Sequence, residues 1–232
     1  MVFIVGMKVM SKLDVVYEDN HIIVVVKPCN ILSQADNTND IDMLSLIKDY
    51  LKEKYNKPGN VYLGLVHRLD RPVGGLMVFA KTSKAASRLS FQVRDRTFKK
   101  SYLAIVRGCD IKSEGHLTDY IVKKNNNSSY VTNAQDGKLC KLFYRVLERN
   151  KEEDLALVSI NLETGRHHQI RVQFASRGYP LYGDQRYGRQ DKKQIALFAN
   201  RLEFIHPVKK ESIIFEKKPY KEGIWNLFKS VN

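Results

Sequence analysis

Short runs of branched and aromatic residues, separated by turn-forming residues, occupy most of the chain. We expect each run to be a β-strand, because such side chains fit a pleated, half-buried surface. The hydrophobic pattern therefore predicts a core dominated by a sheet. The runs are Ile22 to Val26, Val61 to Val66, Leu76 to Ala80, Tyr102 to Val106, Leu142 to Leu147, Leu155 to Ile160, Leu202 to Ile205 and Ser212 to Phe215.

Apolar residues at helical spacing predict helices over 41–55, 83–93 and about 168–176, the last ending before Gly178. A final turn is expected around 225–228. Strands and helices do not alternate regularly enough for a doubly wound parallel sheet, so the pattern favours a mixed α+β domain.

The chain shows no internal repeat and no Gly/Ser linker. We therefore expect a short N-terminal extension, 1–13, followed by one domain over 14–232. The polar stretch 123–138 (KKNNNSSYVTNAQDGK) is flanked by strand-like segments and is expected to be a long hairpin or a solvated loop.

Composition describes a folded, water-soluble protein of 232 residues with 43% hydrophobic and 28% charged residues. Lysine and arginine number 39 against 25 acidic residues, a net charge of +14. Such an excess suits a polyanionic partner. Charge alone does not separate RNA from DNA or from anionic lipid.

The cysteines Cys29, Cys109 and Cys140 are odd in number, widely separated and never in a C-x-x-C pair. They suggest neither a disulfide framework nor a zinc ribbon, and they fit a reducing compartment. The start, MVFIVGMKVM, lacks the basic flank and cleavage site of a signal peptide, and no apolar run is long enough for a membrane helix. We expect a cytoplasmic protein without membrane contact.

A first cluster of candidate chemistry lies in residues 64–81, GLVHRLDRPVGGLMVFAK. An apolar strand ends at His67, and Asp70 follows in a charged turn between Arg68 and Arg71. A carboxylate at the end of a rigid strand is accessible, and neighbouring cations favour its ionised form. Judged on this local pattern alone, a turn cap or a surface ion pair explains Asp70 more economically than catalysis does.

A second cluster lies in residues 162–188, where a strand ends and Arg166, His167, His168 and Arg171 follow. Arginine, histidine and tyrosine together are typical of sites that bind phosphates and stack on unpaired bases. Neighbouring helix positions point about 100° apart, and no H-x-x-x-H motif or acidic cluster is present. We therefore expect hydrogen-bonding or phosphate-facing histidines and no metal.

Between these clusters, residues 88–108 interleave basic and aromatic side chains, including Lys99 and Lys100. This pattern suggests a track for RNA. Strand alternation places Tyr102, Ala104 and Val106 on one face, so a core role for Tyr102 is the alternative.

These segments, in this order, resemble the RluA family of pseudouridine synthases. The matching stretches are EDNHIIVVVKPCNILSQ, HRLD, KKSYLAIVRG, and TGRHHQIRV with GYPLYGD. The resemblance extends from about Val15 to Phe215. One such motif alone is weak, whereas four in family order are specific.

The resemblance implies a mixed, largely antiparallel sheet with helices and loops around an RNA-binding cleft. It implies isomerisation of uridine to pseudouridine without cofactor or metal. We expect the substrate to be structured RNA, rRNA or else tRNA, and the protein to act as a monomer. Asp70 would be the catalytic carboxylate, Tyr102 would lie against the target base, Arg171 would pair with the aspartate, and Arg68 would help displace the nucleotide. The residues expected to bind RNA are Arg68, His67, Arg71, Arg166, His168, Lys99 and Lys100.

The sequence departs from the family at several points. The usual turn is H-R-L-D-x-x-T-S-G-L, whereas Val73 and Gly74 stand here in place of the two hydroxyl residues. Asn30 replaces a usual glycine, and asparagine tolerates a left-handed turn. Only about 13 residues precede the pattern, so we expect no S4-type RNA-binding domain of the kind that many relatives carry.

Two other functions remain open from the sequence. A non-catalytic RNA-binding module would keep the scaffold and bind RNA without forming product. A glycosidase would need a second positioned acid, for which Glu163 is the nearby candidate.

Overall fold

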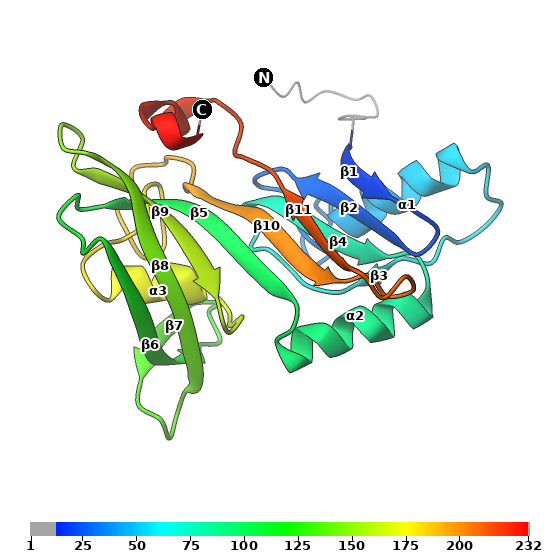
Figure 1. The fold of residues 1–232 in the computed structure, drawn as a ribbon, viewed down its shortest axis with the longest axis horizontal. Coiled ribbons are helices and arrows are strands. Elements are labelled where there is room, and N and C mark those ends of the chain that lie inside the picture. The colour runs from blue at the N-terminus through cyan, green and yellow to red at the C-terminus, as the bar shows by residue number, and fades with distance from the viewer. Residues whose placement is uncertain (1–12, 232) are drawn as a thin grey trace.

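Eleven strands form one mixed sheet in the computed structural model, which describes residues 13–231 (Figure 1). The order is β1-β2-β4-β10-β5-β9-β8-β6-β7, with β11 on β10 and β3 on β4. Among the described strands, β4 and β10 are the only parallel neighbours. The strands are β1 (Asp14–Glu18), β2 (Ile22–Lys27), β3 (Gly64–Leu65), β4 (Gly74–Ala80), β5 (Lys99–Arg107), β6 (Glu114–Lys123), β7 (Ser129–Thr132), β8 (Lys138–Asn150), β9 (Leu155–Leu162), β10 (Leu197–Ile205) and β11 (Ser212–Glu216).

The helices are α1 (Met43–Lys54), α2 (Ser83–Asp95) and α3 (Gln169–Ala175), with 3-10 turns at η1 (Gly223–Leu227) and η2 (Lys229–Val231). The side chains of Asp42 and Thr82 cap α1 and α2 by accepting backbone N–H bonds. None of the helices in the described range has the length and apolar character needed to cross a membrane.

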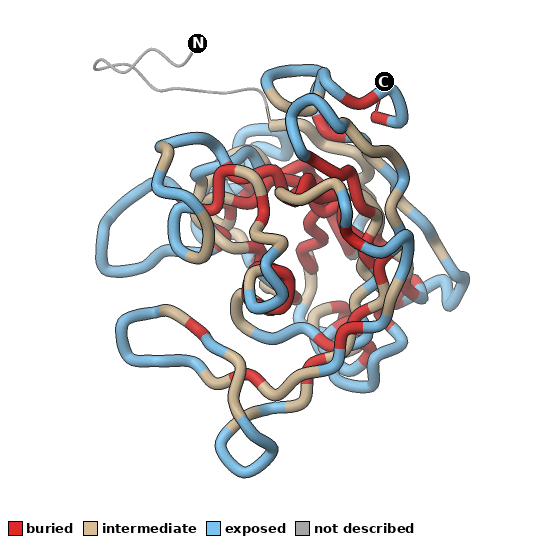
Figure 2. Tube along the Cα trace, turned by 90° about the vertical axis from the view of Figure 1, so that its left-hand side faces the viewer, coloured by how far each residue is buried: buried red, intermediate tan, exposed pale blue. Residues whose placement is uncertain are grey.

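The central strands β5 and β10 join two lobes (Figure 1). One lobe holds β1, β2 and β4 with α1 and α2, and the other holds β6 to β9 with α3. Buried segments run through the middle of the molecule, while exposed segments form the outer loops (Figure 2). Tyr102, Ala104 and Val106 belong to one buried cluster, as strand alternation predicts.

The mixed α+β prediction is confirmed, and most expected elements lie within two or three residues of their observed bounds. The strands β1 and β6 were not expected, because their charged and polar residues dilute the apolar pattern. The polar stretch 123–138, expected to be a hairpin or a loop, includes β7, which pairs with β6 as a hairpin. The expected extension 1–13 lies outside the described residues except for its last residue, Leu13.

The strand expected over 61–66 is shortened to β3, because two strands share one edge of β4. The opposite edge of β4 is paired with β2 from Gly75 to Ala80. On the shared edge, β10 pairs with Gly74 and Gly75, whereas β3 pairs with Phe79 and Ala80. Neither β3 nor β10 reaches the middle of this edge. The chain between β3 and β4 leaves the sheet at this point.

His67 fills this interruption. Its Nε2 accepts a hydrogen bond from the Val78 N–H at 3.2 Å, so a buried backbone donor gains a partner. The ring is buried beside Phe98, with 5.4 Å between ring centroids. Burial, with a smaller contribution from Lys100, lowers the pKa of His67 to about 3, so the imidazole is neutral. The structure thus gives His67 a place in the sheet, and its contact with RNA stays a prediction.

Gly75 allows β4 and β10 to approach closely. Its φ is +124°, and a Cβ there would lie 2.4 Å from the backbone nitrogen of Ala199. Both the backbone conformation and the lack of space require glycine.

Replacing Gly75 by alanine should therefore destabilise the fold strongly. Gly178→Ala is the matched control, because Gly178 has φ +83° but nothing within 4 Å of its added Cβ. Gly178→Ala should lower the free energy of unfolding by about 1–2 kcal/mol, because only the left-handed backbone opposes the added Cβ. Gly75→Ala should cost a further 1–3 kcal/mol, roughly, for the clash. Urea unfolding measures both variants, and equal losses would contradict the close approach.

Acidification should destabilise the fold through His67. The unfolded imidazole has a pKa near 6.5, and the folded one about 3, so only the unfolded chain takes up a proton between these values. Unfolding free energy attributable to His67 should fall by about 2 kcal/mol between about pH 7 and about pH 5.

Urea unfolding at both pH values tests this, with His67→Gln as the variant, since the glutamine oxygen can still accept from Val78. The variant should lose less stability on acidification than the wild type. The exposed His116, replaced by Gln, should leave the pH response unchanged. An identical pH response in His67→Gln and the wild type would show that His67 is protonated in the fold.

Candidate active site

The turn that carries Asp70 is held by residues that follow β2. The Ser33 hydroxyl donates to the Leu69 carbonyl at 2.8 Å and accepts from the Leu69 N–H at 3.1 Å. The fully buried Lys27 ammonium donates to the Arg71 carbonyl at 3.0 Å and to two carbonyls of its own segment. Burial lowers the pKa of Lys27 to about 8. These bonds fix the backbone on both sides of the aspartate.

The turn has a third support that compensates for the missing hydroxyl residues. Asn30 adopts the left-handed conformation with φ 65°, as its replacement of glycine predicts. Its amide donates to Gln194 Oε1 at 2.9 Å, and Gln194 Nε2 donates to the Pro72 carbonyl at 2.6 Å. Side-chain bonds from other segments thus hold this turn.

The glycine at position 74 matches its surroundings. A Cβ there would lie 3.1 Å from Cys29 Sγ and 3.4 Å from the Phe198 ring. Because Cys29 fills the space beside the turn, a larger residue at position 74 would crowd it.

Arg171, on α3, lies between two carboxylates. Its Nε and Nη2 donate to the two oxygens of Asp184, each at 2.8 Å, and its Nη1 donates to Asp70 Oδ2 at 3.3 Å. Burial opposes the charge of Arg171, but both carboxylates outweigh it and raise its pKa. Burial alone would raise the pKa of Asp184, yet the bonds from Arg171 lower it. Arg171 and Asp184 are therefore both charged at neutral pH.

His168 also contacts Asp70. Its Nε2 lies 3.5 Å from Asp70 Oδ2, the same oxygen that Arg171 approaches. Burial, reinforced by Arg171 and opposed by Asp70, lowers the pKa of His168 to about 4, so the ring is neutral. Within residues 13–231, no cluster of three or more His, Cys, Asp or Glu side chains is placed to hold a metal ion.

A cavity of about 250 Å³ opens beside Asp70. Tyr102 lines it, and burial together with the charge of Asp70 raises the pKa of its hydroxyl, which stays neutral. Lys100 also lines the cavity, and its ammonium group lies close to Gly165. A Cβ added to Gly165 would lie 3.2 Å from Lys100 Nζ. The volume is just below that of drug-sized sites, roughly 300 Å³ and above, and suits a single base. Apolar walls come from Leu69, Val73, Val93, Leu162, Ile170 and Leu197.

A wider groove of about 910 Å³ continues from the cavity past Asp70. Asp70, Arg68 and His168 line both spaces. The basic residues of the groove come from separate segments, so the net charge of the chain has a local concentration here. They are Arg68, Arg71, Lys123, Arg171, Arg186 and Lys193.

Most of the predicted site residues come together. The cavity is lined by Asp70, Tyr102, Arg171, Arg68, His67, Arg166, His168 and Lys100. Arg71 lines the groove and pairs with Asp40 at 2.8 Å. Lys99 is exposed at the start of β5 and lines neither space.

Several site residues were missed from the sequence. Asp184 belongs to the GYPLYGD motif, whose acidic end could have suggested a partner for an arginine. Lys27 lies in the K-P motif, but its three carbonyl contacts have no local signature. Ser33 lies in the matching stretch EDNHIIVVVKPCNILSQ, but its contact with Leu69 has no local signature, and Gln194 lies outside the matching stretches.

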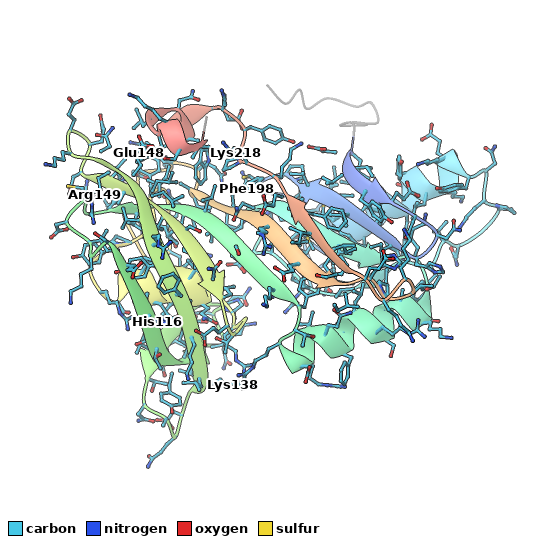
Figure 3. All side chains as sticks on the ribbon, in the orientation of Figure 1. His116, Lys138, Glu148, Arg149, Phe198 and Lys218 are labelled. Atoms are coloured by element: carbon cyan, nitrogen blue, oxygen red, sulfur yellow. The ribbon has the colours of Figure 1, made fainter. Side chains whose placement is uncertain are left out.

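Glu163, the second acid that a glycosidase would need, lies elsewhere. It pairs with His116 at 3.8 Å, and both side chains are exposed. His116 lies on β6, which pairs with β8 away from the centre of the sheet (Figure 3). Glu163 lines neither the cavity nor the groove.

Comparison with known proteins agrees with this geometry. The family model described as RNA pseudouridylate synthase matches residues 21–176. The chain is 33% identical over 220 residues to the uncharacterized RNA pseudouridine synthase YhcT of Bacillus subtilis, covering 94% of this chain and 72% of that protein. It is 34% identical over 234 residues to ribosomal large subunit pseudouridine synthase D of Pseudomonas aeruginosa, covering 93% of this chain and 71% of that protein.

Solved structures share the fold. Human RNA pseudouridylate synthase domain containing 4 superimposes with a TM-score of 0.74 at 21% identity, with 89% of each chain covered. Human RNA pseudouridylate synthase domain containing 1 gives 0.73 at 20% identity, with 94% of each covered. Sequence and fold agree, and the chain belongs to the RNA pseudouridylate synthase family.

Proposed function

We propose that this RNA isomerase converts specific uridines of structured RNA to pseudouridine, with Asp70 as its catalytic carboxylate. The observation that carries the proposal is the shared cavity of Asp70 and Tyr102, in which Arg171 holds the carboxylate. In the reaction the bond between N1 of uracil and C1′ of ribose breaks and a bond between C5 and C1′ forms, while C5 loses a proton and N1 gains one.

The two oxygens of Asp70 differ in their surroundings. Oδ2 faces Arg171 and His168, whereas no hydrogen bond from the described residues reaches Oδ1. We assign Oδ1 as the reacting oxygen, which attacks the nucleoside or takes its ribose proton. Arg171 holds Oδ2 for either role by donating to it from Nη1.

The remaining side chains bind and place the nucleotide. A base cannot reach the cavity while it is stacked, so the uridine must leave its helix. The ring of Tyr102 would lie against the extracted base. Arg68 is exposed and lines both spaces, which suits a residue that takes the place of the departing base.

The basic groove supports a phosphate-rich substrate. Relatives named as ribosomal large subunit synthases favour rRNA, with tRNA as the second candidate. We further propose that the enzyme acts as a monomer. We place the reaction in the cytoplasm.

Asp70→Asn should abolish pseudouridine formation and leave RNA affinity within about twofold, because the amide keeps the shape but not the charge of the carboxylate. Carbodiimide labelling with primer extension detects the product, and filter binding gives the affinity. Glu163→Gln is the matched control and should keep full activity. Product from Asp70→Asn would remove Asp70 from catalysis. A wild type that binds RNA and forms no product would instead identify a binding module.

Asp184→Asn should lower both the free energy of unfolding and the single-turnover rate. It leaves the buried guanidinium of Arg171 with one carboxylate, that of Asp70 at 3.3 Å. Removing one member of a buried ion pair costs about 3–5 kcal/mol. The control is Glu114→Gln, which removes the carboxylate partner of Arg145 in an ion pair that is exposed on both sides and should cost about 1 kcal/mol or less. Urea unfolding and single-turnover assays measure both variants. Equal effects would show that Arg171 does not depend on Asp184.

A further inference from the structure

Ser129 joins the β6–β7 hairpin to the histidines beside the active site. This serine is buried at the start of β7, opposite Lys123. Its backbone N–H donates to the Tyr187 hydroxyl at 2.7 Å, and its Oγ lies 2.9 Å from His167 Nδ1. Two bonds from one residue thus connect the hairpin with the catalytic cavity.

The Tyr187 hydroxyl contacts the ring nitrogen that sets the tautomer of His168. It lies 2.7 Å from His168 Nδ1, and its other polar neighbour among the described residues is the Ser129 N–H, which can only donate. Among the described residues, His168 Nδ1 is therefore the one acceptor within reach of the phenol proton. When the phenol donates to it, the single N–H of the neutral imidazole is on Nε2.

This Nε2 is the atom that lies 3.5 Å from Asp70 Oδ2. The His168 ring cannot turn freely, because His167 stacks on it with 3.8 Å between centroids, and Tyr187 packs against it edge-on. Arg171 lies over the Tyr187 ring, 5.1 Å from its centroid. The groups around Oδ2 thus support one another.

We propose that His168 and Tyr187 are positioning residues for Asp70. Tyr187 fixes His168 as the Nε2–H tautomer, and this N–H acts with Arg171 to hold Oδ2, so that Oδ1 faces the nucleoside. The neutral imidazole orients the carboxylate without placing a second positive charge beside it. The inference rests on the proposed role of Asp70 and adds two residues to it.

The kinetic test is Tyr187→Phe, which removes the hydroxyl and keeps the ring over Arg171. The single-turnover rate constant should fall by about tenfold to 100-fold, as misplaced catalytic groups typically cause, and RNA affinity should change by less than about twofold.

Tyr182→Phe is the matched control, because the Tyr182 ring also lies under a guanidinium, that of Arg107, at 4.8 Å. No hydrogen bond from the described residues reaches its hydroxyl. This variant should keep the wild-type rate. If Tyr187→Phe is as fast as Tyr182→Phe, or loses affinity in place of rate, the proposal is overturned.

A spectroscopic test needs no activity. Nitrogen-15 histidine labelling resolves the protonation of each ring nitrogen, and the chain has only six histidines. Comparison with His168→Gln identifies the His168 signals. In the wild type at about pH 7, Nε2 should be protonated and Nδ1 not, whereas Tyr187→Phe should show a mixture of tautomers. A wild-type Nδ1–H tautomer or imidazolium would refute the proposal, as would an unchanged tautomer in Tyr187→Phe.

The two proposals fail separately. If the wild type forms no pseudouridine on any RNA, the proposed function is wrong, and the tautomer measurement still decides the link between Tyr187 and His168. If the wild type forms pseudouridine and Tyr187→Phe matches the control, only the positioning role is lost.

Discussion

The active site depends on one buried guanidinium that two carboxylates share. Removing a charge from water is costly unless it is paired and hydrogen-bonded, so Arg171 requires partners from other segments. Asp184 comes from the loop after α3, and Asp70 comes from the turn between β3 and β4. The helix, the loop and the turn must therefore converge on one point.

Arg171 binds Asp184 more closely than it binds Asp70. Asp184 is fully buried and takes two bonds of 2.8 Å, whereas Asp70 is partly exposed and takes one of 3.3 Å. The flat fork of arginine suits this arrangement, because it can bind one carboxylate with two nitrogens and offer a third outward. Asp184 thus serves as the anchor that leaves Asp70 accessible to substrate.

The sequence predicts the local parts of this arrangement better than the distant ones. Runs of branched and aromatic residues indicated most strands. Alternation along β5 placed Tyr102 on the correct face, because successive side chains of a strand point to opposite sides. Asp70, by contrast, was only a possible turn residue until motifs elsewhere in the chain gave it partners. The bond between Asn30 and Gln194 joins residues 164 positions apart. Contacts of this kind arise from the packing of separate segments, and no spacing in the sequence encodes them.

The place of the site follows from the way the sheet is paired. Since β3 and β10 share one edge of β4 and leave its middle unpaired, the chain between β3 and β4 leaves the sheet and forms the turn with Asp70. His67 accepts the bond of the Val78 N–H that this interruption frees, and it does so only three residues before the aspartate. The buried neutral histidine and the partly exposed aspartate are thus two consequences of one break in pairing. The proposed catalytic carboxylate is accessible at this point because the sheet itself is incomplete there, while the neighbouring side chains keep the turn in one conformation.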